Sequence, residues 1–195
     1  MHCKQSEMSI FPIVTYDHSG LRTPAEPIPE NNDGLPEFID NLFDTMHQAG
    51  GVGLAAPQVG IPLQLFVVDA DIMTEEEDGT KHGPGVFINP EVTPVGDEEW
   101  DAEEGCLSLP DVREKVTRPY RIKIRYFDRE FQVREEEHEG WYARVLQHEF
   151  DHLKGVLFID YLGSFRKRLL RGKLQNIIDG KVETEYLVVA KNADR

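Results

Sequence analysis

The segment His148-Glu149-Phe150-Asp151-His152 constrains this 195-residue chain more than any other feature. It lies within residues 140–153, where Trp141, Val145 and both histidines recur at the spacing of one helix face, before a stop at Gly155. Two histidines four residues apart on a helix lie about 6 Å from each other and can chelate one divalent metal. Glu149 can then act as a general base on a water molecule held there. The alternative is that these are ordinary residues of a core-facing helix.

A hydrolytic metal site needs a third protein ligand and one open position. Residue 158 is Phe158, so the segment lacks the third histidine of the metzincin peptidases, and Glu183 and Glu185 lie beyond another predicted helix. Cys106, in the segment Glu-Gly-Cys-Leu-Ser-Leu-Pro, is the better candidate, because a thiolate is a soft metal ligand. A lone cysteine is more often a small buried hydrophobe, and that alternative stays open.

A third segment rich in small residues runs from residue 51 to residue 60. It has neither the G-x-G-x-x-G spacing nor the lysine of a phosphate-binding loop. Its small side chains would leave a backbone edge open to a ligand, and the amide of Gln58 can donate a hydrogen bond to a polarised oxygen. The alternative is a tight turn packed beneath a helix.

Composition narrows the function classes. The chain carries 21 basic and 36 acidic residues, a net charge of −15, which argues against a surface for DNA or anionic lipid. No stretch approaches the roughly 18 consecutive apolar residues of a membrane span, and the first ten residues lack the apolar run of a signal peptide. The two cysteines, Cys3 and Cys106, are far apart, which indicates a reducing compartment. We therefore expect a cytoplasmic protein that binds neither membrane nor DNA.

The remaining patterns predict one α+β catalytic domain over residues 1–195. Antiparallel β-sheets are expected to pack around the helix that carries both histidines, with a further helix near each end of the chain. The predicted segments are a mobile tail at 1–9, a turn-rich arm to residue 34, helices at 35–46 and 164–180, strands at 64–68 and 86–88, and a hairpin at 121–127 and 131–137. Ser164 is the expected cap of the last helix, and Leu169 is expected on its apolar face. The acidic run at 75–78, within the segment 69–85 that separates two predicted strands, is predicted to be a solvated loop and not a site.

Taken together, three motifs in this order resemble the signature of the peptide deformylase family: Gly-x-Gly-Leu-Ala-Ala-x-Gln, Glu-Gly-Cys-Leu-Ser and Gln-His-Glu-x-x-His-Leu. The resemblance runs from about residue 10 to about residue 176. Members of this family remove the N-formyl group from the first methionine of new bacterial and organellar proteins and release formate, and the resemblance implies the same reaction here. The implied residues are the metal ligands Cys106, His148 and His152, the acid/base Glu149, and the oxyanion donors Gln58 and the backbone N–H of Leu107.

The resemblance also implies a cofactor and a way of binding the substrate. Family members carry one divalent metal per chain, typically ferrous iron, with zinc, nickel or cobalt as substitutes. An N-formylmethionyl nascent peptide is expected to lie as an added strand against Val52 and Gly53, with Gly105 on its other side. The expected lining of the methionine pocket is Val52, Trp141, Arg144, Val145 and His148, since positions 141, 144 and 145 share the helix face of position 148.

Two arginines of the expected substrate site leave open questions. An apolar residue is common at position 144 in the family, so the stem of Arg144 is expected to line the pocket with its guanidinium outside. Arg113 matches a family arginine near the mouth of the cleft; the alternative is a surface ion pair. Glu104, Gln147 and Asp151 are candidates to hold the metal ligands by hydrogen bonds.

A basic cluster distinguishes the C-terminal helix from the rest of this acidic chain. Its members are Arg166, Lys167, Arg168, Arg171, Lys173 and Lys181, with Asp179 as the only acidic residue among them. Because deformylases act on nascent chains, we expect this cluster to contact ribosomal RNA; the alternative is a solvated helix face.

Three other functions compete with deformylation. A zinc endopeptidase would use the same histidines and Glu149 on internal amide bonds. A thiol hydrolase would use Cys106 as nucleophile and His148 as base. A metal-binding module would use the ligands without catalysis.

Overall fold

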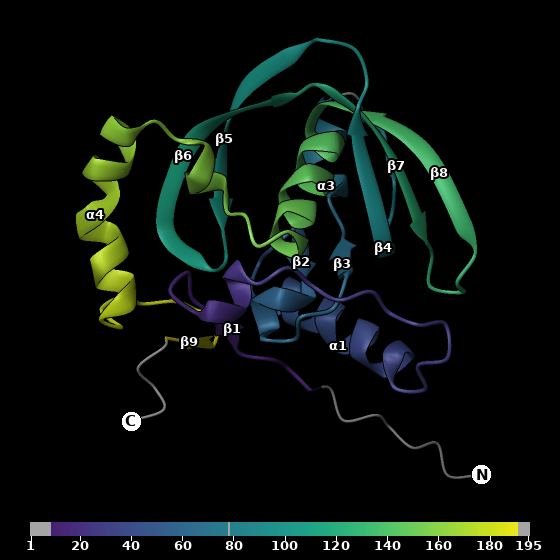
Figure 1. The fold of residues 1–195 in the computed structure, drawn as a ribbon, viewed down its shortest axis with the longest axis horizontal. Helices are drawn as coiled ribbons and strands as arrows, with labels where there is room; N and C mark the ends of the chain where they lie inside the picture. The colour runs from purple at the N-terminus through teal and green to yellow at the C-terminus, as the bar shows by residue number, and fades with distance from the viewer. Residues whose placement is uncertain (1–8, 78, 191–195) are drawn as a thin grey trace.

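The computed structural model describes residues 9–77 and 79–190, and its α+β fold is built around one central helix (Figure 1). The predicted mobile tail at 1–9 lies, apart from Ser9, outside the described residues. The α-helices are α1 (Leu35–Gln48), α2 (Asp71–Glu77), α3 (Gly140–Leu153) and α4 (Ser164–Ile178), and the short 3-10 helices are η1 (Ser19–Arg22), η2 (Ala56–Val59) and η3 (Phe158–Tyr161). The strands are β1 (Ile13–Val14), β2 (Gly53–Ala55), β3 (Leu65–Val68), β4 (Gly85–Pro94), β5 (Glu99–Cys106), β6 (Leu109–Pro119), β7 (Arg121–Phe127), β8 (Val133–Glu139) and β9 (Val188–Val189). The prediction of an α+β class is confirmed.

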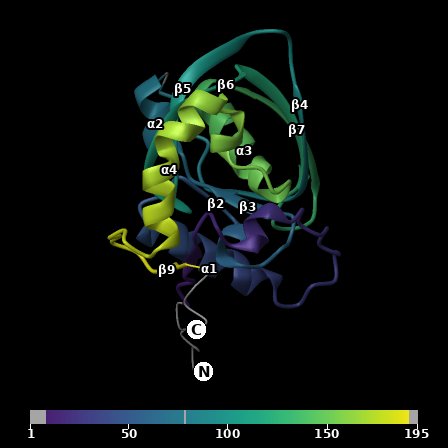
Figure 2. The same ribbon diagram turned by 60° about the vertical axis from the view of Figure 1, so that its left-hand side comes forward.

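Two antiparallel sheets lie on either side of α3, as Figures 1 and 2 show. One sheet has five strands in the order β2-β3-β4-β7-β8, and the other is the β5–β6 hairpin. The β4 strand is longer than the predicted strand at 86–88, and its pairing with β7 shifts register between Ile88 and Glu91. The predicted hairpin at 121–137 is present as β7 and β8, although β8 begins at Val133 and continues to Glu139. This arrangement encloses the helix that bears both histidines.

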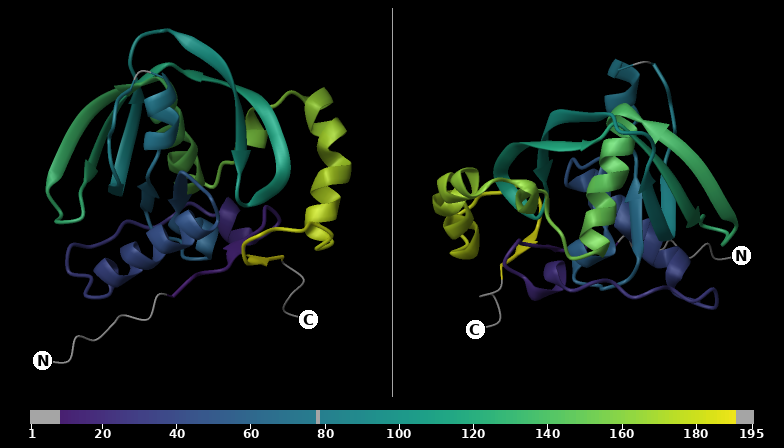
Figure 3. Two further views of the ribbon diagram at one scale, coloured as in Figure 1. Left: turned by 180° about the vertical axis from the view of Figure 1, so that it is seen from behind. Right: turned by 45° about the horizontal axis from the view of Figure 1, so that its top comes forward.

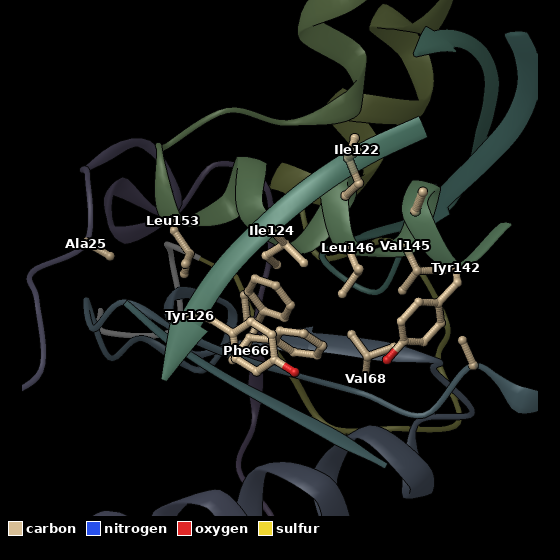
Figure 4. Close-up of a cluster of buried hydrophobic side chains, with 14 residues drawn as sticks. Ala25, Phe66, Val68, Ile122, Ile124, Tyr126, Tyr142, Val145, Leu146 and Leu153 are labelled. Carbon is tan, nitrogen blue, oxygen red and sulfur yellow. The ribbon is translucent and has the colours of Figure 1, made fainter. Parts of the chain in front are cut away.

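The largest part of the hydrophobic core fixes α3 against the five-stranded sheet. Val145 and Leu146 of α3 belong to the same buried cluster as Phe66 of β3 and Ile124 of β7 (Figure 4). Burial of such side chains stabilises a fold by about 1.5–3 kcal/mol each. The polar ligand-bearing face of α3 is therefore held by apolar contacts on its other sides.

The chain turns sharply at Gly155, just after α3. Gly155 has a φ of +73°, and a Cβ at this position would lie 2.7 Å from the backbone oxygen of Arg22. Both the left-handed backbone and the close approach favour glycine here. The predicted end of the helix before Gly155 is confirmed.

The predicted helix at 35–46 is α1, which continues to Gln48. Pro36 stands in its first turn, where its missing N–H removes no helical hydrogen bond. Its apolar stripe packs Ile39, Leu42 and Met46 into a second buried cluster beneath β2 and β3. The spacing of the apolar residues was sufficient to place this helix.

The prediction of a solvated loop at 75–78 is wrong for residues 75–77, which form the end of α2, while residue 78 lies outside the described residues. Thr74 is buried, and its hydroxyl donates to the backbone oxygen of Thr80 at 2.8 Å. The carboxylate of Asp71 accepts from the backbone N–H groups of His82 and Gly83. These hydrogen bonds and the contact of α2 with α3 outweigh the acidic composition that suggested a loop.

The two ends of the described chain also differ from the expectations. β9 pairs in parallel with β1, so the residues after α4 return to the N-terminal arm. The α4 helix begins at Ser164 with Gly163 as its cap residue, one residue earlier than expected. Leu169 does not lie on its buried face, because its side chain is 59% exposed, whereas Leu170 and Ile177 are buried. Among the described residues, no helix has both the length and the apolar character needed to cross a membrane.

Candidate active site

The structure brings Cys106, His148 and His152 together from two elements. Cys106 ends β5, the two histidines lie on α3, and one ligand atom from each residue lies within 4.8 Å of the other two. Sγ of Cys106 is 3.4 Å from Nε2 of His152. Metal–ligand bonds of about 2.3 Å to sulfur and about 2.1 Å to nitrogen, at a tetrahedral angle, would separate these two atoms by about 3.6 Å. The residues present therefore fit a divalent metal.

Glu104 orients His148. Nδ1 of His148 donates to Oε2 of Glu104 at 3.0 Å, which leaves the other ring nitrogen for a metal. Burial lowers the pKa of His148, but hydrogen bonds to Cys106 and Glu104 outweigh burial and raise that pKa well above its usual value. Burial instead lowers the pKa of His152, and the nearby His148 lowers it further.

Glu104 is itself held by two buried arginines. Arg118 donates to both of its carboxylate oxygens, at 2.6 Å and 2.9 Å, and Arg144 donates to Oε1 at 2.7 Å. Burial raises the pKa of Glu104, but the hydrogen bonds from Arg118 and His148 outweigh it and hold that pKa well below its usual range. Arg118 also donates to Asp151, at 2.7 Å. Glu104 thus links the ligand helix to the β5–β6 hairpin through ionised groups.

Gln147 is one of the three residues predicted to hold the metal ligands by hydrogen bonds, but it bonds to other groups. Its amide donates to the backbone oxygens of Pro119 and Ala143 rather than to a ligand side chain. Asp151 is linked to the ligands only indirectly: it accepts from Arg118, which binds Glu104, and it also accepts from the hydroxyl of Tyr161. Only Glu104 of these three has a hydrogen bond to a ligand among those in the described part of the chain.

Glu149 is buried beside the ligands and has a free carboxylate oxygen. Its side chain is 4% exposed, and its Oε2 has no hydrogen-bond partner within the described residues. Burial raises the pKa of Glu149 to about 7, in spite of the opposite effect of a charged His148. A Cβ at Gly53 would lie 2.5 Å from Oε1 of Glu149, so the second glycine of the Gly-x-Gly-Leu-Ala-Ala-x-Gln motif makes room for this carboxylate.

The amide of Gln58 is oriented toward Cys106. Its Oε1 accepts from the backbone N–H of Ala55 at 2.8 Å, which leaves Nε2 on the side of the metal ligands. Nε2 lies 3.5 Å from Sγ of Cys106 and 3.4 Å from Oγ of Ser108. The segment at 51–60 is therefore part of the site and more than a packed turn.

These residues surround a pocket of about 440 Å³. It brings together most of the predicted site residues: Val52, Gly53, Gln58, Gly105, Cys106, Leu107, Arg113, Trp141, Arg144, Val145, His148 and Glu149. His152 does not line the pocket and reaches the site through its contact with Cys106. Met73 of α2 and Tyr186 also line it, and neither was predicted. Neither carried a signal, since Met73 lay in a presumed loop and Tyr186 in a segment without a predicted element.

The expectation that the guanidinium of Arg144 lies outside the protein, in solvent, is wrong, because the group is buried. Arg144 is 2% exposed, and it donates to Glu104 and to the backbone oxygens of Val116 and Trp100. Its guanidinium lies over the ring of Trp100, 4.5 Å from the centroid, which is a cation–π contact. The buried carboxylate of Glu104 provides the counter-charge that sequence reasoning could not place.

The position of Arg113 agrees with both alternatives given for it, a place near the mouth of the cleft and a surface ion pair. It lines the pocket, and its side chain is 73% exposed with Nη1 3.9 Å from Glu103. An exposed ion pair of this length contributes little to stability. The guanidinium is therefore available to a ligand at the mouth of the pocket.

An α+β fold that groups one cysteine and two histidines beside a pocket lined by a buried glutamate defines a metal-dependent hydrolase. The family model described as polypeptide deformylase matches residues 10–168. This chain belongs to the polypeptide deformylase family.

Individual relatives agree with the family match. A peptide deformylase from Salinibacter ruber is 52% identical over 187 residues, which cover 94% of this chain and 96% of that protein. The crystal structure of peptide deformylase from Ehrlichia chaffeensis in complex with actinonin has a TM-score of 0.80 at 32% identity, and the match covers 90% of this chain and 100% of that one. A peptide deformylase structure from Legionella pneumophila has a TM-score of 0.77 at 36% identity, covering 89% and 98% of the two chains.

Proposed function

We propose that Cys106, His148 and His152 form the centre at which this chain carries out its family's reaction. That reaction is the metal-dependent removal of the N-formyl group from the first methionine of newly synthesised proteins, with release of formate. The observation that carries the assignment is the approach of the three ligand atoms to within 4.8 Å of one another, beside the buried Glu149.

The donor set of one thiolate and two imidazoles suits a first-row divalent metal. When bound, such a metal polarises the formyl oxygen and lowers the pKa of a water molecule. We assign ferrous iron as the metal in the cell, with zinc, nickel or cobalt as substitutes.

Glu149 is the acid/base of the proposed reaction. Glu149 lines the pocket beside the ligands, and its unpartnered oxygen can accept a proton from the attacking water. The same oxygen can return that proton to the amine of methionine as the formyl C–N bond breaks. The negative charge that develops on the formyl oxygen is stabilised by the amide of Gln58 and the backbone N–H of Leu107.

The pocket supports a position for the substrate. We propose that the peptide backbone lies as an added strand between residues 52–53 and Gly105, since both segments line the pocket with backbone edges. The methionine side chain then enters between Val52, Trp141, Val145 and the stem of Arg144, and Arg113 lies at the mouth. The carboxylate of Glu104 holds the guanidinium of Arg144 back, so its charge does not oppose an apolar side chain.

Replacing Gln58 by methionine is expected to lower kcat by about 10²–10³-fold with little change in KM, because the variant loses one oxyanion donor. Formate release under saturating formyl-methionyl tripeptide measures the effect. Gln64→Met is the matched control, since Gln64 donates to the backbone oxygen of Ala25 and does not line the pocket. Equal kcat values for the two variants would remove Gln58 from the oxyanion site.

The assignment is tested by the products of the purified, metal-loaded protein. We expect formate and a free methionyl tripeptide from a formyl-methionyl tripeptide, and no fragments from a denatured protein substrate. Fragments without formate would instead identify an endopeptidase. One bound metal per chain without either product would identify a metal-binding module.

We further propose that the exposed basic face of α4 contacts ribosomal RNA, so that the enzyme meets nascent peptides in the cytoplasm. Arg166, Lys167, Arg168, Arg171 and Lys173 are all exposed on this helix. Lys167 and Lys173 donate to the backbone oxygens of Asp160 and Asp111, which fixes part of the cluster against the body of the protein.

Neutralising Arg166, Lys167, Arg168 and Arg171 to glutamine is expected to abolish salt-sensitive co-sedimentation with ribosomes, while activity on a tripeptide persists. The control removes the same number of positive charges from the β7–β8 hairpin: Arg121, Lys123, Arg125 and Arg134. Equal co-sedimentation of the two variants would contradict the proposed contact.

A further inference from the structure

The residues after α4 return to the active site, where β9 attaches them to the N-terminal arm. β9 runs beside β1, as the view from behind in Figure 3 shows. The backbone N–H of Ile13 donates to the oxygen of Leu187 at 2.8 Å, and that of Thr15 donates to Val189 at 3.1 Å. On the other side of Tyr186, the hydroxyl of Thr184 donates to the backbone oxygen of Tyr186 at 2.7 Å. The residues that directly follow Tyr186 are therefore fixed beside β1, and the hydrogen bond with Thr184 closes a turn within the same segment.

The side chain of Tyr186 reaches the loop that follows the metal ligand Cys106. Its hydroxyl donates to the backbone oxygen of Leu107 at 2.8 Å, and the residue lines the pocket. Its ring packs against the buried cluster formed by α1, β2 and β3. Tyr186 and Leu107 are 79 positions apart in the sequence, and Tyr186 lies outside both of the sheets that flank α3.

Leu107 is held from a second side by Gly51. A Cβ at Gly51 would lie only 2.8 Å from Cδ1 of Leu107, so the leucine side chain packs directly on the glycine backbone. With the side chain fixed by Gly51 and the carbonyl fixed by Tyr186, rotation of Leu107 about its backbone bonds is restricted. The direction of its N–H is then set before substrate binds.

We propose that Tyr186 is a positioning residue that fixes Leu107 so that the N–H of Leu107 points at the formyl oxygen. This inference rests on the proposed function, because it assumes that Leu107 is an oxyanion donor. Preorganised donors act without reorganisation at the moment of reaction, and a donor that moves loses part of that advantage. The effect of Tyr186 should therefore appear in kcat and not in KM.

Tyr186→Phe removes the hydroxyl and keeps the ring that packs against the core. We expect a three- to tenfold fall in kcat for formate release, the range of one net hydrogen bond, with KM changed less than twofold. Tyr126→Phe is the matched control, because Tyr126 lies in the core of the five-stranded sheet and does not line the pocket.

Hydrogen–deuterium exchange of residues 103–110 in the zinc-loaded proteins supplies a readout independent of catalysis. We expect faster exchange in this segment for Tyr186→Phe only, with the rest of the chain unchanged. Unchanged kcat in an active enzyme, or a rise in KM that matches the fall in kcat, would overturn the inference and leave deformylation intact. If the unsubstituted protein releases no formate, the proposed function fails, and unchanged exchange at 103–110 would then overturn the positioning role as well.

Discussion

Replacing Glu149 by glutamine is expected to lower kcat for formate release by about 10²–10⁴-fold. The substitution keeps the volume of the side chain but removes the group that accepts the proton from water and returns it to the leaving amine. Formate is measured at saturating formyl-methionyl tripeptide with matched metal content.

The metal content of the variant and a control substitution complete this test. The Glu149→Gln protein should bind one metal per chain, as the unsubstituted protein does, because Glu149 is not among the three grouped ligands. Glu137→Gln, in the exposed part of β8, is the control for loss of one carboxylate. Activity of Glu149→Gln within tenfold of that control would show that another group carries the proton.

Replacing Glu104 by alanine is expected to lower the free energy of unfolding by about 3–5 kcal/mol. The variant leaves the guanidinium groups of Arg118 and Arg144 buried without their shared carboxylate, and such unpaired buried charges are costly. Metal affinity should also fall by about 10–100-fold, since Nδ1 of His148 loses its acceptor. Urea unfolding and metal titration measure the two effects.

Glu103→Ala is the matched control for Glu104→Ala. The two residues are neighbours on β5, but the side chain of Glu103 is 58% exposed and lies 3.9 Å from Arg113. We expect its loss to change the free energy of unfolding by less than about 1 kcal/mol. Similar unfolding midpoints for the two variants would show that the buried network does not stabilise the fold.

The ligand helix and its chemistry could be predicted because the signals are local. The spacing of His148 and His152 places both on one face of a helix, and Gly155 marks its end. The same holds for α1, whose apolar residues follow the helical period. The three motifs then indicated which distant cysteine and glutamine complete the site.

The network around Glu104 could not be predicted, because its partners meet only in the folded chain. Glu104, Arg118 and Arg144 come from β5, β6 and α3, and none of their spacings is local. Arg144 was expected to carry its charge outward, since a buried arginine requires a counter-charge that the sequence does not reveal. The charged residues of β5 and β6 also concealed the hairpin itself.

Met73 and Tyr186 were missed for a similar reason. The acidic residues around Met73 indicate a solvated segment, whereas a hydrogen bond accepted by Asp71, one donated by Thr74 and the contact with α3 stabilise α2. Tyr186 reaches the pocket because β9 pairs with β1 across almost the whole length of the chain. Pairing of two such short strands leaves no pattern in either one.

The central claim is that this chain is a metal-dependent deformylase in which Cys106 is a ligand and not a nucleophile. The most direct measurement is formate release from a formyl-methionyl tripeptide by oxygen-free protein, before and after a chelator removes the metal and again after ferrous iron is restored. We expect activity to be lost when the metal is removed and to return when ferrous iron is restored. Full activity of the metal-free protein, abolished by alkylation of Cys106, would contradict the account and identify a thiol hydrolase.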